Sequence, residues 1–356
     1  MNSDLNSLID HPFTSIQLAD KEKFHTGMLK LLLEYSQANL IEHKLFKNNI
    51  LHKPKCDLEI KSVDLLVTQA NHTTIIETKF KTGLHSTIFK NNLVSQIQKY
   101  ASTHKQADEG IVVSLFKENN DLTILEHKIS KFKNITFTNE ILELLNSVNK
   151  NESIISTPVF NLLILWKSYL TDLKILVDNF ESKKLNSLND NGLKDSLHKL
   201  KLKGVFQQYR MHLVKDKVDK LINSAEKIKG KLGNTHGNAL LCYEIKFDKN
   251  DFNFEKYGVQ WQNGKFKFFI EVKNNSKKSN IRDVPLKKIG TSLHVKFFKK
   301  DKLPKNVNRS GKFKSFNIAE AEEFSDLNRL PYKIADCLNY LIDNQKFILE
   351  LTSQNK

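Results

Sequence analysis

The sequence predicts an α/β protein in which a mixed sheet flanked by helices is followed by a helical region and a basic α+β region. Three observations lead to this prediction. In the first 150 residues, apolar positions switch between helical and strand spacing in the order α, β, β, α, β, α. Helical spacing dominates residues 151–235, and strand spacing returns from residue 236 onward. Basic residues are concentrated in the second half of the chain.

The first 150 residues contain the elements of the predicted mixed sheet. Helical spacing of apolar residues predicts helices over residues 23–38, 86–104 and 138–148. Short apolar runs predict strands over residues 63–67, 75–80 and 110–116. A polar break separates the first two strands and predicts a hairpin centred between Ala70 and Asn71. In that hairpin, residues whose numbers add up to 141 lie opposite each other.

The second half of the chain reads as two further regions. A polar stretch from Asn146 to Pro158 predicts a boundary near residue 150, so the expected domains are 1–150, a helical region 151–235 and a basic α+β domain 236–356. Helices are predicted over residues 158–182, 191–202, 207–229 and 331–351. Strands are predicted over residues 239–247, 258–262, 265–272 and 292–298, with Asn263-Gly264 as a hairpin turn.

Composition points to a cytoplasmic protein. The residues are 39% hydrophobic and 27% charged, as in soluble globular proteins. Residues 1–12 do not have the pattern of a signal peptide, and no apolar run approaches the roughly 20 residues of a membrane span. The three cysteines form no Cys-x-x-Cys pair, so we expect neither a disulfide framework nor a structural zinc site.

The charge of the chain is unevenly distributed. Residues 1–150 contain 18 Lys and Arg against 17 Asp and Glu, whereas residues 151–356 contain 38 against 23. Residues 271–314 alone contain 14 basic and 3 acidic side chains. Such a block attracts polyanions, so the expected partner is nucleic acid rather than a membrane. The alternative is a lysine-rich solvated surface without a specific partner.

The candidate catalytic residues are Asp64, Glu77 and Lys79 in the predicted hairpin. Because 64 and 77 add up to 141, the two carboxylates should face each other across the strands, about 5 Å apart at Cβ. Like charges in that position need a cation between them, and Mg²⁺ prefers carboxylate oxygens. Lys79 shares the Glu77 face of its strand, where it can orient an attacking water and stabilise charge. The backbone carbonyl of Thr78 is a third expected metal ligand.

These residues resemble the signature of the PD-(D/E)XK nuclease superfamily, with the spacing Asp64-x12-Glu77-x-Lys79. Val63 stands where the motif often has proline. Gln96 and Tyr100 resemble the Gln-x-x-x-Tyr element of the RecB-like branch, which implies that they contact substrate. The opening Phe24-His25-Thr26 helix resembles bacterial families of this superfamily that act in restriction and phage defence. The resemblance covers about residues 20–120 and implies a restriction-endonuclease-like fold.

The Glu-x-Lys triplet is not specific, because the chain contains seven. The strongest competitor is Glu271-Val-Lys273, but the turn at Asn263-Gly264 places Lys256 opposite Glu271 rather than an aspartate. Glu34, near the end of the first predicted helix, is a further candidate metal ligand because the superfamily often has an acidic group on this helix. His25 and the tryptophans are expected to be structural.

The resulting expectation is a Mg²⁺-dependent nuclease, with Mn²⁺ as a substitute, that hydrolyses phosphodiester bonds of DNA, with a role in defence against foreign DNA as a further hypothesis. The alternative is a non-catalytic nucleic-acid-binding protein on a nuclease-like fold. A homodimer is compatible with double-strand cleavage, although the sequence shows no interface.

Overall fold

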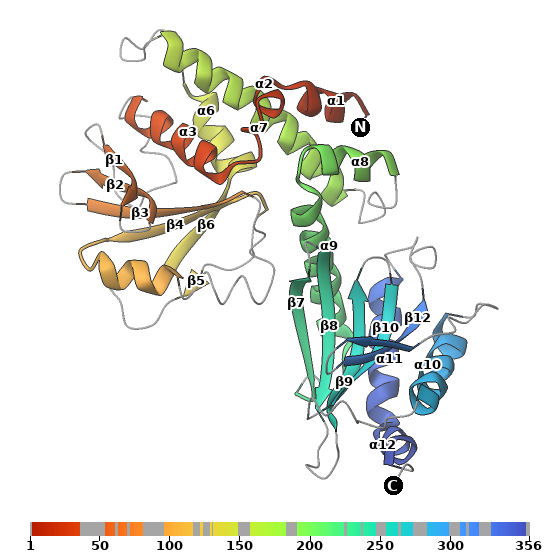
Figure 1. Ribbon diagram of the computed structural model, residues 1–356. Helices are drawn as coiled ribbons and strands as arrows, with labels where there is room; N and C mark the ends of the chain where they lie inside the picture. The colour runs from red at the N-terminus through yellow and green to blue at the C-terminus, as the bar shows by residue number, and fades with distance from the viewer. Residues whose placement is uncertain are drawn as a thin grey trace. The chain divides into compact units, whose positions relative to one another are not determined.

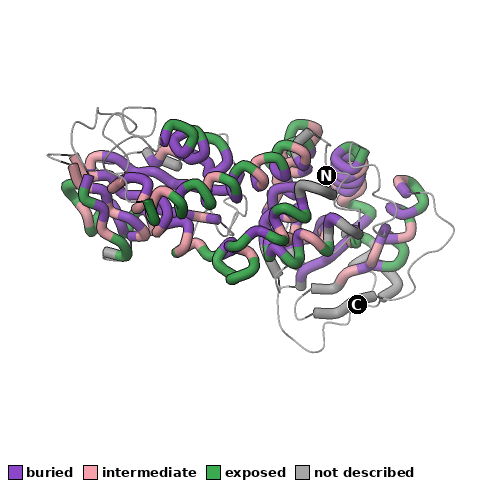
Figure 2. The backbone as a smooth tube through the Cα atoms, turned by 90° about the horizontal axis from the view of Figure 1, so that it is seen from above, coloured by how far each residue is buried: buried purple, intermediate pink, exposed green. Residues whose placement is uncertain are grey.

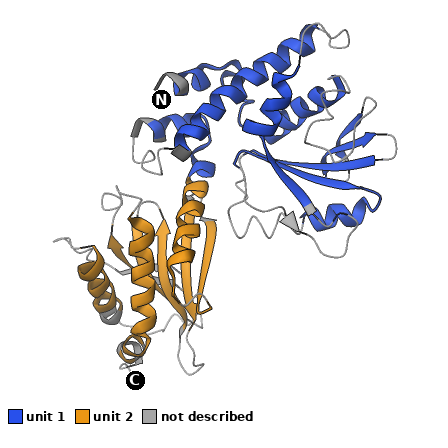
Figure 3. Ribbon diagram, turned by 180° about the vertical axis from the view of Figure 1, so that it is seen from behind, with its two compact units in different colours: residues 1–183, 190–206 blue, residues 184–189, 207–356 orange. Residues whose placement is uncertain are grey.

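The computed structural model divides the chain into two compact units (Figure 3). Unit 1 contains residues 1–183 and 190–206, and unit 2 contains residues 184–189 and 207–356. The structure describes residues 2–35, 54–60, 63–69, 72–80, 96–116, 122–123, 129, 131–148, 157–182, 191–223, 226–235, 238–246, 254–262, 265–272, 283–298, 307–310, 313–319 and 329–353. The part of the predicted second helix at residues 86–95 lies outside these ranges.

Unit 1 is built on a six-stranded mixed sheet (Figure 1). Its strands, in the spatial order β1-β2-β3-β4-β6-β5, are β1 (Lys55–Ile60), β2 (Val63–Gln69), β3 (His72–Lys79), β4 (Glu109–Ser114), β5 (Leu122–Thr123) and β6 (Lys131–Thr136). β3, β4 and β6 pair in parallel, and the remaining neighbours pair antiparallel. The α/β class with a mixed sheet is therefore confirmed.

Helices cover both faces of this sheet. They are α1 (Asn2–Asp10), α2 (Pro12–Ser15), α3 (Glu22–Tyr35), helical residues 96–103, the π-helical turn η1 (Phe137–Ile141), α6 (Leu142–Asn146), α7 (Thr157–Ser182) and α8 (Asn191–Lys199). α3 packs on β1, β2 and β3. On the opposite face, Ile97 and Tyr100 share a buried cluster with Ile75 and Val112. Buried and exposed residues alternate around the helices, as expected where one side contacts a core (Figure 2).

The first compact unit extends beyond the predicted boundary near residue 150. α7 packs against α1, α3, α6 and η1, and α8 packs against α1. Trp166 and Tyr169 on α7 are almost fully buried and contact His25 on α3. The expected helical region 151–235 is therefore not a separate body: α7 and α8 complete the first unit, and most of α9 (Lys203–Leu221) belongs to the second.

The β2–β3 hairpin has the predicted register. Leu65 lies opposite Ile76, Val67 opposite Thr74, and the pairing continues to Gln69 and His72. All of these pairs add up to 141, so the prediction is confirmed.

Unit 2 contains a six-stranded antiparallel sheet. Its strands, in the order β11-β12-β10-β9-β8-β7, are β7 (Ile228–Thr235), β8 (Asn238–Lys246), β9 (Phe254–Gln262), β10 (Lys265–Val272), β11 (Val307–Ser310) and β12 (Phe313–Ala319). The helices are α9, α10 (Asp283–Phe297), α11 (Leu330–Asp343) and α12 (Gln345–Ser353). Apolar residues of these helices form one buried core with one face of the sheet.

One predicted strand of this unit is wrong, and one predicted helix ends too late in the sequence. Residues 292–298 alternate like a strand, but residues 292–297 belong to the helix α10, because Leu286, Ile289 and Leu293 recur at helical spacing and are buried in the core. The helix predicted over residues 207–229 ends at Leu221, and Ile228 begins β7. In both places burial against distant segments overrides the local pattern.

The described helices include none that could cross a membrane. None of them, including the 26-residue α7, combines the length and the apolar character that a bilayer requires.

Candidate active site

The structure brings Glu77 and Lys79 into direct contact on β3. The Lys79 ammonium donates a hydrogen bond to Oε1 of Glu77 and forms an ion pair with it. The Glu77 side chain is fully buried, and that of Lys79 is 17% exposed. Their shared face follows from their spacing of two residues on a strand. Thr78 and Phe80 point to the opposite face, where they contact Thr26 and His25 of α3.

Asp64 joins this group from β2 through Thr78. Both the backbone N–H of Thr78, at 2.8 Å, and its hydroxyl, at 2.9 Å, donate to Oδ2 of Asp64. The β2–β3 ladder ends at the pair Leu65 and Ile76, and the Asp64 carboxylate accepts the Thr78 N–H that lies beyond it. N–H and C=O of one strand residue point to the same neighbouring strand, so the Thr78 carbonyl also faces β2 here.

This arrangement differs from two carboxylates facing each other around a metal. Asp64 turns toward Thr78, and the cation in contact with Glu77 is the Lys79 ammonium. The two carboxylates still influence each other, because the charge of Asp64 raises the pKa of Glu77. The register brings the two residues to the end of the same ladder, and the hydrogen bonds of Asp64 set the direction of its side chain.

Glu77 has the most perturbed carboxyl group of this cluster. Burial raises its pKa to about 7, the charge of Asp64 adds to this shift, and the charge of Lys79 opposes it. Its Oε2 atom is buried and accepts no hydrogen bond from any residue that the structure describes. A buried oxygen of this kind is costly unless it has a ligand.

Gln96 and Tyr100 lie beside this carboxyl group. They are four residues apart on the helical residues 96–103, and Nε2 of Gln96 donates to the Tyr100 hydroxyl. The Tyr100 hydroxyl is close enough to affect the pKa of Glu77, although it is not placed to donate to Oε2. Burial and the Glu77 charge together raise the pKa of Tyr100 well above its usual value.

The first turns of α3 add two residues that the sequence analysis missed. Thr26 places its hydroxyl 2.6 Å from that of Thr78 and 2.9 Å from the backbone carbonyl of Glu22. The charge of Glu22 raises the pKa of Lys79, so its carboxylate acts on the same ammonium as Glu77 does. Glu22 and Thr26 are four residues apart and share one side of the helix. That spacing is the only local signal for them.

Glu34 does not join the cluster. Its Oε1 atom accepts a hydrogen bond of 3.2 Å from the backbone N–H of Cys56 and lies 3.5 Å from the Lys30 ammonium. Thr26, which reaches the cluster, is eight residues away, or about 12 Å along a helix. The helix α3 thus contacts the cluster through Thr26 in its first turns, whereas Glu34, near its other end, bonds to Cys56 and Lys30 in this arrangement.

The competing triplet in unit 2 has a structural role. Glu271 lies opposite Lys256, as predicted, and pairs with it at 2.8 Å. Lys256 also pairs with Glu244 at 3.0 Å, and Glu244 with Lys231 at 2.6 Å. These residues form a row of alternating charges across β7–β10, and an aspartate opposite Glu271 is lacking.

His25 is a core residue, as expected. It is fully buried, stacks on Phe80 at 3.8 Å, accepts a hydrogen bond from the Trp166 indole at Nδ1, and lies 2.9 Å from the Ala19 carbonyl at Nε2. These partners favour the neutral tautomer with the proton on Nε2. Burial lowers its pKa to about 4.

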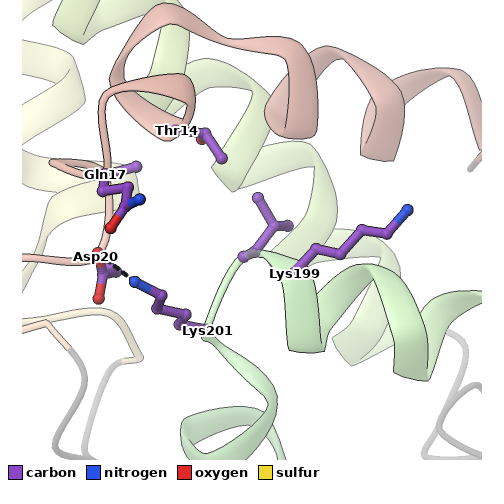
Figure 4. A pocket seen from close by; sticks show the side chains of 7 residues that line it. Thr14, Gln17, Asp20, Lys199 and Lys201 are labelled. Atoms are coloured by element: carbon purple, nitrogen blue, oxygen red, sulfur yellow. Dashed lines mark ion pairs between the residues drawn. The ribbon is translucent and has the colours of Figure 1, made fainter.

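Unit 1 also contains a pocket of 290 Å³ that includes none of the predicted site residues (Figure 4). Its lining comes from the segment before α3 and from the end of α8. Lys201 points toward Asp20, with Nζ 3.9 Å from Oδ1. Gln17 and Lys201 have positive φ angles of 60° and 56°. The pocket is therefore a polar recess between two tight turns, distinct from the carboxylate cluster.

The residues around Glu77 fit a hard divalent cation, although the described residues contain no set of three His, Cys, Asp or Glu side chains grouped for a metal. Both hydrogen bonds of Asp64 end on Oδ2, which leaves Oδ1 for another partner. The buried Oε2 of Glu77 supplies a second oxygen, and the Thr78 carbonyl faces the same side of β3 as Asp64. Two carboxylates and a carbonyl are ligands typical of Mg²⁺.

Comparison of the chain with models of protein families, with curated proteins and with solved structures finds no match.

Proposed function

We propose that this protein is a Mg²⁺-dependent nuclease that hydrolyses phosphodiester bonds of DNA, with unit 1 as the catalytic unit. The observation that supports it best is the convergence of Asp64, Glu77 and Lys79 on one position of the mixed sheet, where Oε2 of Glu77 is buried without a partner among the described residues. A purely structural ion pair has no need for a second acid or for an unsatisfied oxygen.

In this proposal Asp64, Glu77 and the Thr78 carbonyl would hold the cation, with Mn²⁺ as a substitute for Mg²⁺. When bound, the ion supplies Lewis-acid activation of the phosphate and of a water nucleophile. Its charge also favours the ionised form of Glu77, whose pKa burial raises.

Lys79 contributes a charge that is already positioned. Its ammonium is held by Glu77 and lies within the field of Glu22 and Asp64, which keeps it protonated. A positioned ammonium hydrogen-bonds the attacking water and stabilises negative charge on the phosphate in the transition state. Gln96 and Tyr100, hydrogen-bonded to each other next to Glu77, are assigned to substrate contacts.

The arrangement of strands supports a restriction-endonuclease-like fold for unit 1. An antiparallel hairpin, β2–β3, carries the acidic residues, and β3 continues in parallel to β4 and β6. The choice of DNA and a role in defence against foreign DNA rest on the resemblance of the motif and of the first helix, and they are proposals by analogy.

In this proposal unit 2 binds the nucleic-acid substrate. Its residues include 31 Lys and Arg against 17 Asp and Glu, whereas unit 1 has 25 against 23. A net charge of +14 on one unit attracts a nucleic-acid backbone and makes binding dependent on salt.

The test is a cleavage assay of the purified protein on plasmid, linear and single-stranded DNA and on RNA, with Mg²⁺, Mn²⁺ or EDTA. We expect metal-dependent cleavage that Lys79→Ala and Asp64→Ala abolish while nucleic-acid binding persists. Lys246→Ala is the matched control, because Lys246 belongs to another Glu-x-Lys triplet and is exposed. Full cleavage by Lys79→Ala would overturn the assignment. Binding without cleavage on every substrate would favour the non-catalytic alternative.

A further inference from the structure

Arg210 on α9 is a buried cation in unit 2. Its side chain is nine-tenths buried, with a residue exposure of 9%. The guanidinium carbon lies 5.2 Å from the centre of the Trp261 ring, near the end of β9. The contact is a cation–π interaction, which Arg forms well because its planar group is weakly hydrated.

The guanidinium of Arg210 has no countercharge within the described part of the chain. It makes no ion pair and no hydrogen bond there, and its Nε atom is buried without an acceptor. Burial lowers its pKa to about 10, and no carboxylate of the described residues contributes to the shift. The group is still charged at neutral pH. Buried charges in proteins are normally paired, because an unpaired one costs several kcal/mol or more.

The outer edge of the guanidinium remains accessible. Of the three guanidinium nitrogens only Nε is a buried atom without a partner, so the two terminal nitrogens reach solvent. The two terminal nitrogens form a planar fork that binds two oxygens of a phosphate or carboxylate. A ligand at this edge would neutralise the buried charge.

We propose that Arg210 anchors an oxyanion site in unit 2 that takes a phosphate group. The net charge of +14 on this unit favours phosphate and disfavours acceptors that carry no charge. The group comes either from a nucleic-acid backbone or from free phosphate, and only the first source rests on the proposed function. The site uses none of the residues assigned to catalysis in unit 1.

The test measures thermal unfolding of the full chain in EDTA, with phosphate compared against NaCl of matched ionic strength. At phosphate ten times its Kd, linkage predicts about an eleven-fold rise in the folding equilibrium constant of the wild type. Arg210→Met should lose this response. Without phosphate it should be at least as stable as the wild type, because the unpaired charge is gone. The exposed Arg329→Met is the matched control and should respond as the wild type does.

Two results would overturn the site: no phosphate-specific response in the wild type, or an unchanged response in Arg210→Met. If Arg210→Met does not fold, calorimetric titration of phosphate into the wild type and Arg210→Lys decides instead, since lysine keeps the charge but loses the fork and should bind more weakly.

Oligonucleotides distinguish the two sources of the phosphate group. Tighter binding of an oligonucleotide than of phosphate, weakened by Arg210→Met, identifies nucleic acid, and equal binding identifies free phosphate. Because EDTA prevents metal-dependent cleavage, these outcomes are independent of the nuclease assay.

Discussion

The hydroxyl of Thr78 donates a hydrogen bond of 2.9 Å to Oδ2 of Asp64. The residue between Glu77 and Lys79 in the sequence therefore holds the carboxylate of the neighbouring strand. Thr26 of α3 lies 2.6 Å from the same hydroxyl, so three separate segments meet at one oxygen. The orientation of the first proposed metal ligand thus depends on a side chain that takes no part in the motif.

Replacing this hydroxyl should weaken the candidate site without unfolding it. Thr78→Val keeps the shape but removes one hydrogen bond to a carboxylate, worth about 1.5–3 kcal/mol. We expect a loss of cleavage of about tenfold or more and a higher Mg²⁺ requirement. Thr78→Ser keeps the hydroxyl and should retain most of the activity. Equal kinetics of the valine and serine variants would show that the bond does not orient Asp64.

Glu77 should make unit 1 less stable as pH rises. Its pKa is about 7 in the folded state against an ordinary 4.5, so the folded state holds the proton more tightly. Stability should fall between pH 4.5 and about 7, by roughly 3 kcal/mol at most. Glu77→Gln should remove this slope. The measurement is urea unfolding in EDTA, followed by Trp166 fluorescence in a Trp261→Phe background, and an unchanged slope would contradict the burial of an ionisable Glu77.

Titration of His25 should change the stability of unit 1 with pH in the opposite direction. Its pKa is lowered from 6.5 to about 4, so the unfolded state binds the proton more tightly between these values. Stability should be lost as pH falls from 6.5 to 4, again by roughly 3 kcal/mol at most. In the wild type this opposes the Glu77 effect between pH 4.5 and 6.5. His25→Gln should therefore expose the Glu77 slope, and Glu77→Gln the His25 slope. A variant pair with identical pH profiles would refute this assignment.

The two acidic residues of α3 should differ in their effect on cleavage. Glu22→Gln removes a charge that acts on Lys79 and should slow cleavage. Glu34→Gln removes the charge beside Lys30, keeps an acceptor for the Cys56 N–H and should leave the rate unchanged. Steady-state cleavage rates of both variants at saturating Mg²⁺ check this. A slow Glu34→Gln enzyme with wild-type stability would restore Glu34 as a site residue.

Gly258 should be irreplaceable in unit 2. A Cβ atom there would lie 1.9 Å from the backbone carbonyl oxygen of Tyr243 on β8, which cannot move independently of the sheet. Gly258→Ala should cost about 1–3 kcal/mol or more, the usual effect of overpacking. Gly27→Ala on α3 is the control, since nothing lies within 4 Å of its Cβ position and alanine favours a helix by about 0.5–1 kcal/mol. Urea unfolding of both variants, followed by tryptophan fluorescence, measures the difference.

Short-range pattern was enough to predict the hairpin that carries the candidate site. Alternation with a period of two and a polar break predicted the register of β2 and β3, and Asn263-Gly264 predicted that Glu271 faces Lys256. Both are local properties, because neighbouring strands joined by a short turn have few alternative pairings. Such reasoning also excluded the competing triplet in unit 2.

Contacts between distant segments determine the features that the local pattern does not predict. The direction of the Asp64 carboxylate, the approach of Thr26 and Glu22, and the exclusion of Glu34 depend on how α3 lies across the sheet. The same holds for residues 292–298, whose strand-like alternation is overridden by burial in a helix, and for Arg210, whose lack of a countercharge no local pattern indicates. Packing depends on contacts throughout the core. A short stretch of sequence therefore shows how side chains are spaced, but not which distant residues they contact.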